Sequence, residues 1–259
     1  MNVLIGLAAG FFGGLVGVGG GIIMIPLMVG ILKMNQHVAH GTSLVALVFT
    51  GLSGTITYAL NGSVDILASV LLASTAVFTA RVGARFANAL PEWKLKMYFG
   101  VFLILVALLL IIKPYLPQID GSVTGWVKII ILLLAGGFTG FLSGMMGVGG
   151  GTIMVPAMVL LAGFTQYTAQ GSSLLAMIPV GVVGAYTHWR LGNVSTSILN
   201  GLIPGILIGS YLGGSLAHLL PEVALRIIFA VVLVRTGIKY LLTSKPKSKE
   251  KENVSSDTE

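Results

Sequence analysis

The 259-residue sequence has no cysteine and few charged residues. The absence of cysteine excludes disulfides, thiolate metal ligands and any reaction that passes through a cysteine thiol. Charged residues make up 9% of the chain and hydrophobic residues 55%, which is more apolar surface than a soluble domain can hide. With a mean hydropathy of +0.97, this composition predicts an all-α, polytopic membrane protein whose main partner is the lipid bilayer.

Acidic residues are the scarcer charged class, with 8 Asp and Glu against 15 Lys and Arg and a formal net charge of +7. In a soluble protein this excess would suggest nucleic acid as a partner. Here the basic residues lie between the apolar runs and in the terminal segment "KPKSKEKE". We therefore interpret them as determinants of topology and of contact with anionic lipid, and we expect no nucleic-acid partner.

Long apolar runs predict the spanning helices, because a hydrocarbon core about 30 Å thick needs about 20 helical residues. The first run lacks a preceding basic segment and has an internal counterpart, so we expect it to be retained rather than cleaved as a signal peptide. No extramembrane domain fits between the runs. They are Val3–Leu32, Gly41–Leu60, Ile66–Ala89, Leu95–Ile112, Val127–Ala162, Gly171–Trp189, Thr196–Leu220 and Ala224–Leu242.

The chain repeats itself without a gap when it is shifted so that Gly17 falls on Gly147. The same shift places "HGTSLVA" on "QGSSLLA" and "LPE" on a second "LPE". Such duplications are common among transporters. The predicted organisation is a first membrane repeat (residues 1–113), a linker (114–125), a second membrane repeat (126–242) and a charged tail (243–259) that we expect to be cytoplasmic and disordered.

Each repeat opens with a run of glycines inside its first apolar segment, in "GVGGGIIMIP" (17–26) and "GVGGGTIMVP" (147–156). Each of these glycines costs about 1 kcal/mol relative to alanine within a helix, so we expect each first helix to be broken or re-entrant. Irregular backbone at membrane depth occurs only where it is buried in protein or lines a polar cavity. The half-helix that follows would point unpaired N–H groups and a positive dipole at that cavity, which suits an anion.

The basic residues choose between two topologies. If each broken segment re-enters, Lys33, Arg81, Lys94 and Arg190 share one side with the tail, and only Lys113, Lys128 and Arg226 face the other. If each segment crosses instead, the basic residues are split between the two sides. Since cytoplasmic loops carry the excess of Lys and Arg, we expect inverted repeats with both termini in the cytoplasm, although a 30-residue run could also make one tilted, broken crossing.

The candidate substrate-binding residues are the two glycine runs, their prolines and the hydroxyl motifs "GTS" and "GSS" that follow. The hydroxyls either donate to substrate or cap their own helices. His40 and Arg81 are candidates for coupling or charge roles, against ordinary interfacial positions. The set is Gly17, Gly19, Gly20, Gly21, Pro26, Gly41, Thr42, Ser43, Gly147, Gly149, Gly150, Gly151, Pro156, Gly171, Ser172 and Ser173.

Other kinds of site do not fit these motifs. The glycine runs lack the last glycine of G-x-G-x-x-G and the Lys-Ser/Thr of a P-loop, so a nucleotide site is not expected. The spans carry no nucleophile and base set and no cluster of metal ligands, which argues against an enzyme. We therefore expect no catalytic residues, no metal and no cofactor.

The duplicated "GFFGGLVGVGGGIIMIPLMV" and "GFLSGMMGVGGGTIMVPAMV", with the "GTS" and "GSS" that follow, resemble the TauE/SafE sulfite exporter family, also called the toluene sulfonate uptake permeases. The resemblance covers residues 3–242. It implies a four-segment internal duplication and a transporter of small sulfur-containing or organic anions such as sulfite, sulfonates or sulfoacetate, in the plasma or inner membrane. The second repeat has Tyr211 where the first has Arg81, which weakens a substrate role for that arginine.

The sequence as a whole predicts a secondary transporter that alternates access to a midplane anion site between inverted repeats. Two alternatives stay open, a passive anion channel and a membrane scaffold without transport activity. Two further partners also stay open, a proton as coupling ion and a second copy of the chain in a homodimer. The sequence specifies neither the substrate nor the direction of transport.

Overall fold

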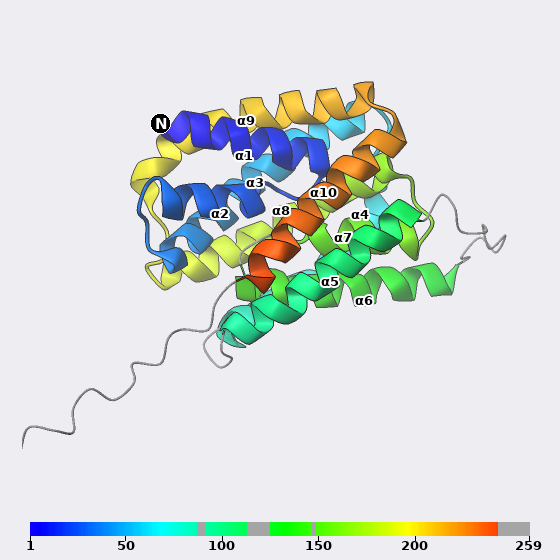
Figure 1. Cartoon of the computed structure of the whole chain (residues 1–259), viewed down its shortest axis with the longest axis horizontal. Coiled ribbons are helices and arrows are strands. Elements are labelled where there is room, and N and C mark those ends of the chain that lie inside the picture. The colour runs from blue at the N-terminus through cyan, green and yellow to red at the C-terminus, as the bar shows by residue number, and fades with distance from the viewer. Residues whose placement is uncertain (87–91, 113–124, 147–148, 243–259) are drawn as a thin grey trace, which may run out of the picture.

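The computed structural model describes residues 1–86, 92–112, 125–146 and 149–242, and these residues form helices joined by short turns (Figure 1). The predicted linker 114–125, except Gly125, and the predicted tail 243–259 lie outside the described residues. The all-α prediction is confirmed. The helices are α1 (Asn2–Val16), α2 (Gly21–Gly30), α3 (Gln36–Leu60), α4 (Ile66–Phe86), α5 (Glu92–Ile112), α6 (Trp126–Met146), α7 (Gly151–Leu160), α8 (Gln166–Arg190), α9 (Thr196–Leu219) and α10 (Glu222–Leu241).

Within the described residues, five helices are long and apolar enough to cross a membrane. Shorter apolar helices include α1, α2 and α7. The runs Val3–Leu32 and Val127–Ala162 are therefore not single helices, because each is divided at its glycine run into α1 and α2 or into α6 and α7. By length and composition the candidate spans are His37–Leu60, Ile66–Gly83, Trp126–Gly144, Gln166–Arg190 and Thr196–Leu219.

The first repeat begins with a re-entrant hairpin. The helix α2 starts beside the middle of α1, where a Cβ atom at Gly20 would lie only 2.6 Å from the Ala9 carbonyl oxygen. The end of α1 lies near the end of α3, because the Tyr58 hydroxyl donates to the Gly14 carbonyl at 3.1 Å. α1 and α3 therefore run in the same direction, and α2 returns the chain to the starting face (Figure 1).

The two repeats are inverted with respect to each other. At the centre, α3 packs antiparallel to α8, since Gly54 meets Leu174 near one end of the contact and Gly184 meets Leu44 near the other. The segments 36–60 and 166–190 occupy equivalent positions in the two repeats, so opposite directions for these helices mean opposite directions for the repeats. The prediction of inverted repeats is confirmed.

The repeats exchange their first helices. α1 packs against α9 of the other repeat, with Gly6 against Leu202 and Gly14 against Ser210 in parallel register. α6 packs in the same way against α4. Glycines at every fourth position let the backbones touch, as in small-xxx-small contacts between helices in lipid. Figure 1 shows α1 and α9 side by side, with the α5 and α10 pair crossing in front of the bundle.

The central helices begin earlier than the sequence predicted. α3 starts at Gln36 and α8 at Gln166, one and a half turns before the expected starts at Gly41 and Gly171. The reason is local capping: the Asn35 side chain accepts from the His37 N–H, and the side chain of Thr165 caps α8 in a similar way. The polar residues before Gly41 and Gly171 form the first turns of both helices.

Candidate functional site

The two glycine runs form joints in which the backbone leaves the helical path. In the first joint Gly17, Gly19 and Gly20 have φ values of 71°, 85° and 77°, which L side chains rarely adopt. In the second joint Gly149 has φ 86° and Gly150 caps α7 with a negative φ of −84°. Gly21 and Gly151 are the first residues of the helices that follow. Gly147 lies outside the described residues.

The two joints touch each other through their backbones. A Cβ atom at Gly151 would clash with the Gly17 carbonyl oxygen and would lie 2.7 Å from the Cα of Val18. A Cβ atom at Gly149 would lie 2.8 Å from the carbonyl oxygen of Val18. The chain thus brings together two breaks that are distant in sequence, and only glycine fits at the contact.

Buried side chains from the two central helices cover the joints. Leu47 of α3 and Met177 of α8 would both lie within 3 Å of a Cβ atom at Gly19. On the polar side, the Ser173 hydroxyl lies 2.8 Å from the carbonyl oxygens of Gly17 and Gln170, to either of which it can donate. The side chains that the structure places at the joints are therefore uncharged. Besides the backbone, their polar groups include a serine, a glutamine and Thr139, whose methyl carbon would lie 2.5 Å from a Cβ atom at Gly150.

Tyr58 and Gln170 hold the first joint from the side. The Tyr58 hydroxyl donates to the Gln170 Oε1 at 2.8 Å or to the Gly14 carbonyl at 3.1 Å. The Gln170 side chain packs against Gly17, and its Nε2 is buried with no hydrogen-bond partner among the described residues. A buried amide donor next to the joint is suited to an acceptor that is brought by a ligand or a water.

The geometry of the joints suits an anion once the bundle opens. α2 and α7 both begin at the joints, and no side chain caps either N-terminus, so two positive helix ends meet at one place. A cavity of about 10 Å³, lined by Phe12, Gly13, Val16, Val18 and their neighbours, lies beside the first joint. This space is no larger than about one water and its lining is apolar, so an anion requires the helices to separate.

Four residues of the hydroxyl motifs lie away from the joints. The Thr42 hydroxyl accepts from the N–H of Ser195 at 3.0 Å, and the Ser172 hydroxyl accepts from the N–H of Asp65 at 2.8 Å. Gly41 packs against Asn193 in the turn before α9, and Gly171 packs against Ser63 in the turn before α4. The two hydroxyls accept from the other repeat rather than capping their own helices, and so fasten each central helix to that repeat. Of this group, Ser173 reaches the joints.

The other predicted residues are more widely spread. Pro26 and Pro156 lie inside α2 and α7, beyond the first turn. The Ser43 hydroxyl donates to the His40 carbonyl at 2.7 Å, and His40 itself is half-buried in α3. Arg81 is exposed on α4. The structure does not bring Arg81 to the joints, in agreement with its lack of a counterpart in the second repeat.

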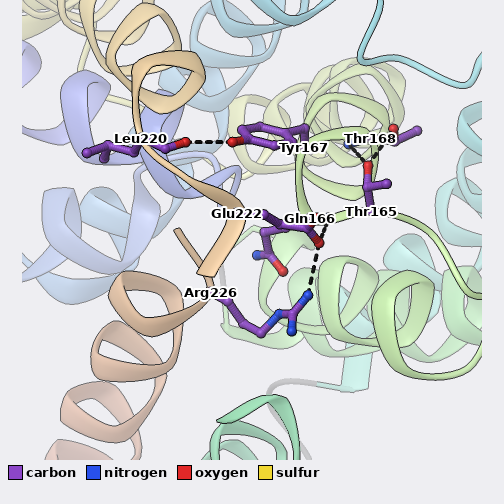
Figure 2. Close-up of polar contacts among 7 residues, drawn as sticks. All are labelled: Thr165, Gln166, Tyr167, Thr168, Leu220, Glu222 and Arg226. Carbon is purple, nitrogen blue, oxygen red and sulfur yellow. Dashed lines mark hydrogen bonds and ion pairs between the residues drawn. The ribbon is translucent and has the colours of Figure 1, made fainter. Parts of the chain in front are cut away.

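Sequence reasoning missed the buried polar side chains that begin α8. Gln166 and Gln170 are fully buried, and the N–H of Gln166 donates to the Glu222 Oε1 at 3.0 Å (Figure 2). The sequence feature that could have indicated these positions is the pair of glutamines one helical turn apart in an otherwise apolar chain. They were overlooked because the helix was expected to start at Gly171.

Similarity to known proteins extends over nearly the whole chain. The model of the family described as "Sulfite exporter TauE/SafE" matches residues 2–240. "Probable membrane transporter protein YunE" of Bacillus subtilis is 28% identical over 261 residues, which cover 92% of this chain and 96% of the relative. A "Probable membrane transporter protein" of Xylella fastidiosa is 30% identical over 242 residues, covering 89% and 90%. No solved structure matches the chain.

Proposed function

Because the chain belongs to the sulfite exporter TauE/SafE family of membrane transporters, we propose that it is a secondary transporter of a small sulfur-containing or organic anion of the sulfite, sulfonate or sulfoacetate type. The anion binds near the bilayer midplane, at the two glycine joints. The inverted repeats then expose this site to each side of the membrane in turn. The proposal includes no chemical step and no cofactor.

The observation that carries the proposal is the contact between the joints, where the starts of α2 and α7 meet beside Gly17 and Gly151. Hydrogen bonds to an ion contribute roughly 1.5–3 kcal/mol each, and a helix terminus adds roughly 0.3–2 kcal/mol. Several backbone N–H groups with the Gln170 amide and the Ser173 hydroxyl therefore offset much of the dehydration of a small anion. Such a site needs no charged side chain.

The same proposal includes an orientation. The chain lies in the plasma or inner membrane with both termini in the cytoplasm, because this places Lys33, Arg81 and Arg190 on the cytoplasmic side. The starts of α1, α3 and α9 then face the cytoplasm, and the starts of α4 and α8 face outward.

Counterflow in proteoliposomes tests the function. Vesicles with the purified protein are preloaded with one anion, and the uptake of labelled sulfite is measured against sulfate, thiosulfate, sulfoacetate and small carboxylates inside. We expect saturable uptake that is stimulated by internal substrate and absent from empty vesicles. Flux without saturation would instead identify a passive channel. Absence of flux for every anion, together with a stable complex on purification, would identify a scaffold.

A further inference from the structure

A second polar cluster lies where α8 and α10 begin, apart from the glycine joints. Glu222 is the first residue of α10, and one of its carboxylate oxygens accepts two bonds. The N–H of Gln166 donates to this oxygen at 3.0 Å, and the Arg226 guanidinium donates to it at 2.9 Å (Figure 2). A helix N-terminus and a guanidinium both bind oxyanions. The Glu222 carboxylate therefore occupies a place that could hold another oxyanion.

The cluster has more donors than this one carboxylate uses. The Gln166 side chain is fully buried, and both polar atoms of its carboxamide lack a partner within the part of the chain that the structure describes. The Nε of Arg226 is buried and unpaired in the same sense. Figure 2 shows the Gln166 carboxamide next to the Glu222 carboxylate, on the side of Arg226. Buried donors without acceptors are costly, and an anion at Glu222 would supply acceptors to the Gln166 Nε2 and the Arg226 Nε, whereas the Gln166 Oε1 is itself an acceptor.

The carboxylate can leave this position. The Glu222 side chain is 34% exposed, whereas the Arg226 side chain is 12% exposed. Rotation of Glu222 toward the surface would expose the α8 N-terminus, the guanidinium and the carboxamide to an incoming anion while the donors stay in place.

The cluster also lies close to the proposed transport site. Gln166 and Gln170 are four residues apart on α8 and share one face of the helix, with Cβ atoms about 5–6 Å apart. Gln170 contacts Gly17 in the first joint. About one turn of α8 therefore separates the cluster from the first joint.

The sequence carries the same three kinds of residue in both repeats. The shift that superposes the repeats places Gln36 on Gln166, Glu92 on Glu222 and Lys96 on Arg226. Each repeat thus has a glutamine at the start of its central helix and an acidic residue followed four residues later by a basic one. In the inverted arrangement, the starts of the two central helices face opposite sides of the membrane.

We propose that Glu222, Arg226 and Gln166 form a second anion site at the face where α8 begins, in which the Glu222 carboxylate is a tethered occupant that an incoming small oxyanion displaces. The inference rests on the proposed function for the identity of the anion, but the site itself is testable without transport. The ligand class is a compact oxyanion with at least two acceptor oxygens, such as a sulfonate or sulfate, because one oxygen meets the guanidinium while another meets the carboxamide.

Thiol labelling of the purified protein in detergent tests the site, because a chain without cysteine gives a single reactive position. In Glu222→Cys the tethered carboxylate is gone and the donors are free. We expect the anionic reagent 2-sulfonatoethyl methanethiosulfonate to react faster than its trimethylammonium counterpart, by about tenfold to a hundredfold more than the same ratio at a control position. Sulfate should slow labelling at position 222 as it saturates the site.

Asp65→Cys is the matched control. Asp65 lies on the same face, is half-buried and caps α4 by accepting from the Ala68 N–H. Its replacement removes the same charge but leaves Glu222 with Arg226. The combination of Glu222→Cys with Arg226→Gln should lower the anion preference to that of the control. Equal ratios at the two positions, no protection by sulfate, or a preference that survives loss of Arg226 would each overturn the proposal. None of these results depends on whether flux is observed.

Discussion

At the residue scale, the glycines of the joints meet two separate requirements. Gly17, Gly19 and Gly20 have positive φ values, whereas Gly151 has an ordinary helical conformation but lies against the backbone of the other joint. Backbone strain would penalise a side chain at the first three positions, and steric overlap would penalise one at Gly151. The motif "GVGGG" therefore encodes both the break and the approach of the two breaks.

We expect Gly151→Ala to lower the free energy of unfolding by about 1–3 kcal/mol, because the new methyl group overlaps Gly17 and Val18 and the joints must move apart. Sulfite counterflow should fall with it. Thermal unfolding in detergent and counterflow measure the two effects.

Gly30→Ala is the control for this variant, since nothing lies within 4 Å of a Cβ atom at this last residue of α2. It should leave transport unchanged and stability equal or slightly higher. Gly151→Ala with wild-type stability and transport would remove the contact between the joints from the mechanism.

The glycine runs could be predicted at this scale, but the roles of the hydroxyls could not. A run of glycines is unfavourable in a helix wherever it occurs, so the breaks before α2 and before α7 follow from local sequence. Thr42 and Ser172 instead accept N–H groups of Ser195 and Asp65 in the opposite repeat. Residue spacing within one repeat carries no information on such a partner.

At the scale of the helices, stripes of glycine replace the hydrophobic effect as the source of association. Lipid is as apolar as the helices, so the bundle depends on close packing and on bonds between helices. Along α6, Gly136, Gly140 and Gly144 contact the backbone of α4, and the Thr75 hydroxyl donates across the same interface to the Leu133 carbonyl at 2.8 Å.

A matched pair on α6 tests this packing. A Cβ atom at Gly140 would lie 2.5 Å from the Cα of Ala76, whereas one at Gly137 would meet no atom closer than 3.9 Å. We expect Gly140→Ala to lower the free energy of unfolding by about 1–3 kcal/mol and Gly137→Ala to leave it unchanged or raise it by up to about 1 kcal/mol. Thermal unfolding in one detergent measures both, and similar shifts would contradict a specific role for the stripe.

The starts of α3 and α8 show where sequence reasoning failed for helices. Hydropathy placed them at Gly41 and Gly171, because Gln36, His37 and Gln166 lower the local average. In the structure the buried glutamine of α8 is embedded in protein rather than exposed to lipid. A hydropathy window treats all surroundings as lipid and so cannot recognise this environment.

At the scale of the whole molecule, the inverted repeats predict that equivalent turns face opposite sides of the membrane. Asn61 ends α3 and Leu191 ends α8, and both are exposed. In intact cells we expect Asn61→Cys to react with an impermeant thiol reagent, and Leu191→Cys to react only after permeabilisation. The reverse labelling would overturn the orientation, and labelling of both without permeabilisation would contradict the inverted arrangement.

The duplication itself was readable from the sequence, as was the inversion through the positions of Lys and Arg. The exchange of first helices was not, because both repeats carry equivalent glycine stripes and each stripe could in principle pair within its own repeat. The contacts of Gly6 with Leu202 and of Gly136 with Leu72 show that each stripe pairs with the other repeat.

That exchange has a consequence for biosynthesis. The partner of α1 is α9, which contacts Gly6 through Leu202. At about 5–20 residues per second, α9 is synthesised on the order of tens of seconds after α1. During this interval the opening hairpin, whose two helices are shorter than a span, can pack against α3 but not against α9. Insertion machinery that shelters the glycine stripe of α1 until α9 arrives is therefore expected to raise the yield of this protein.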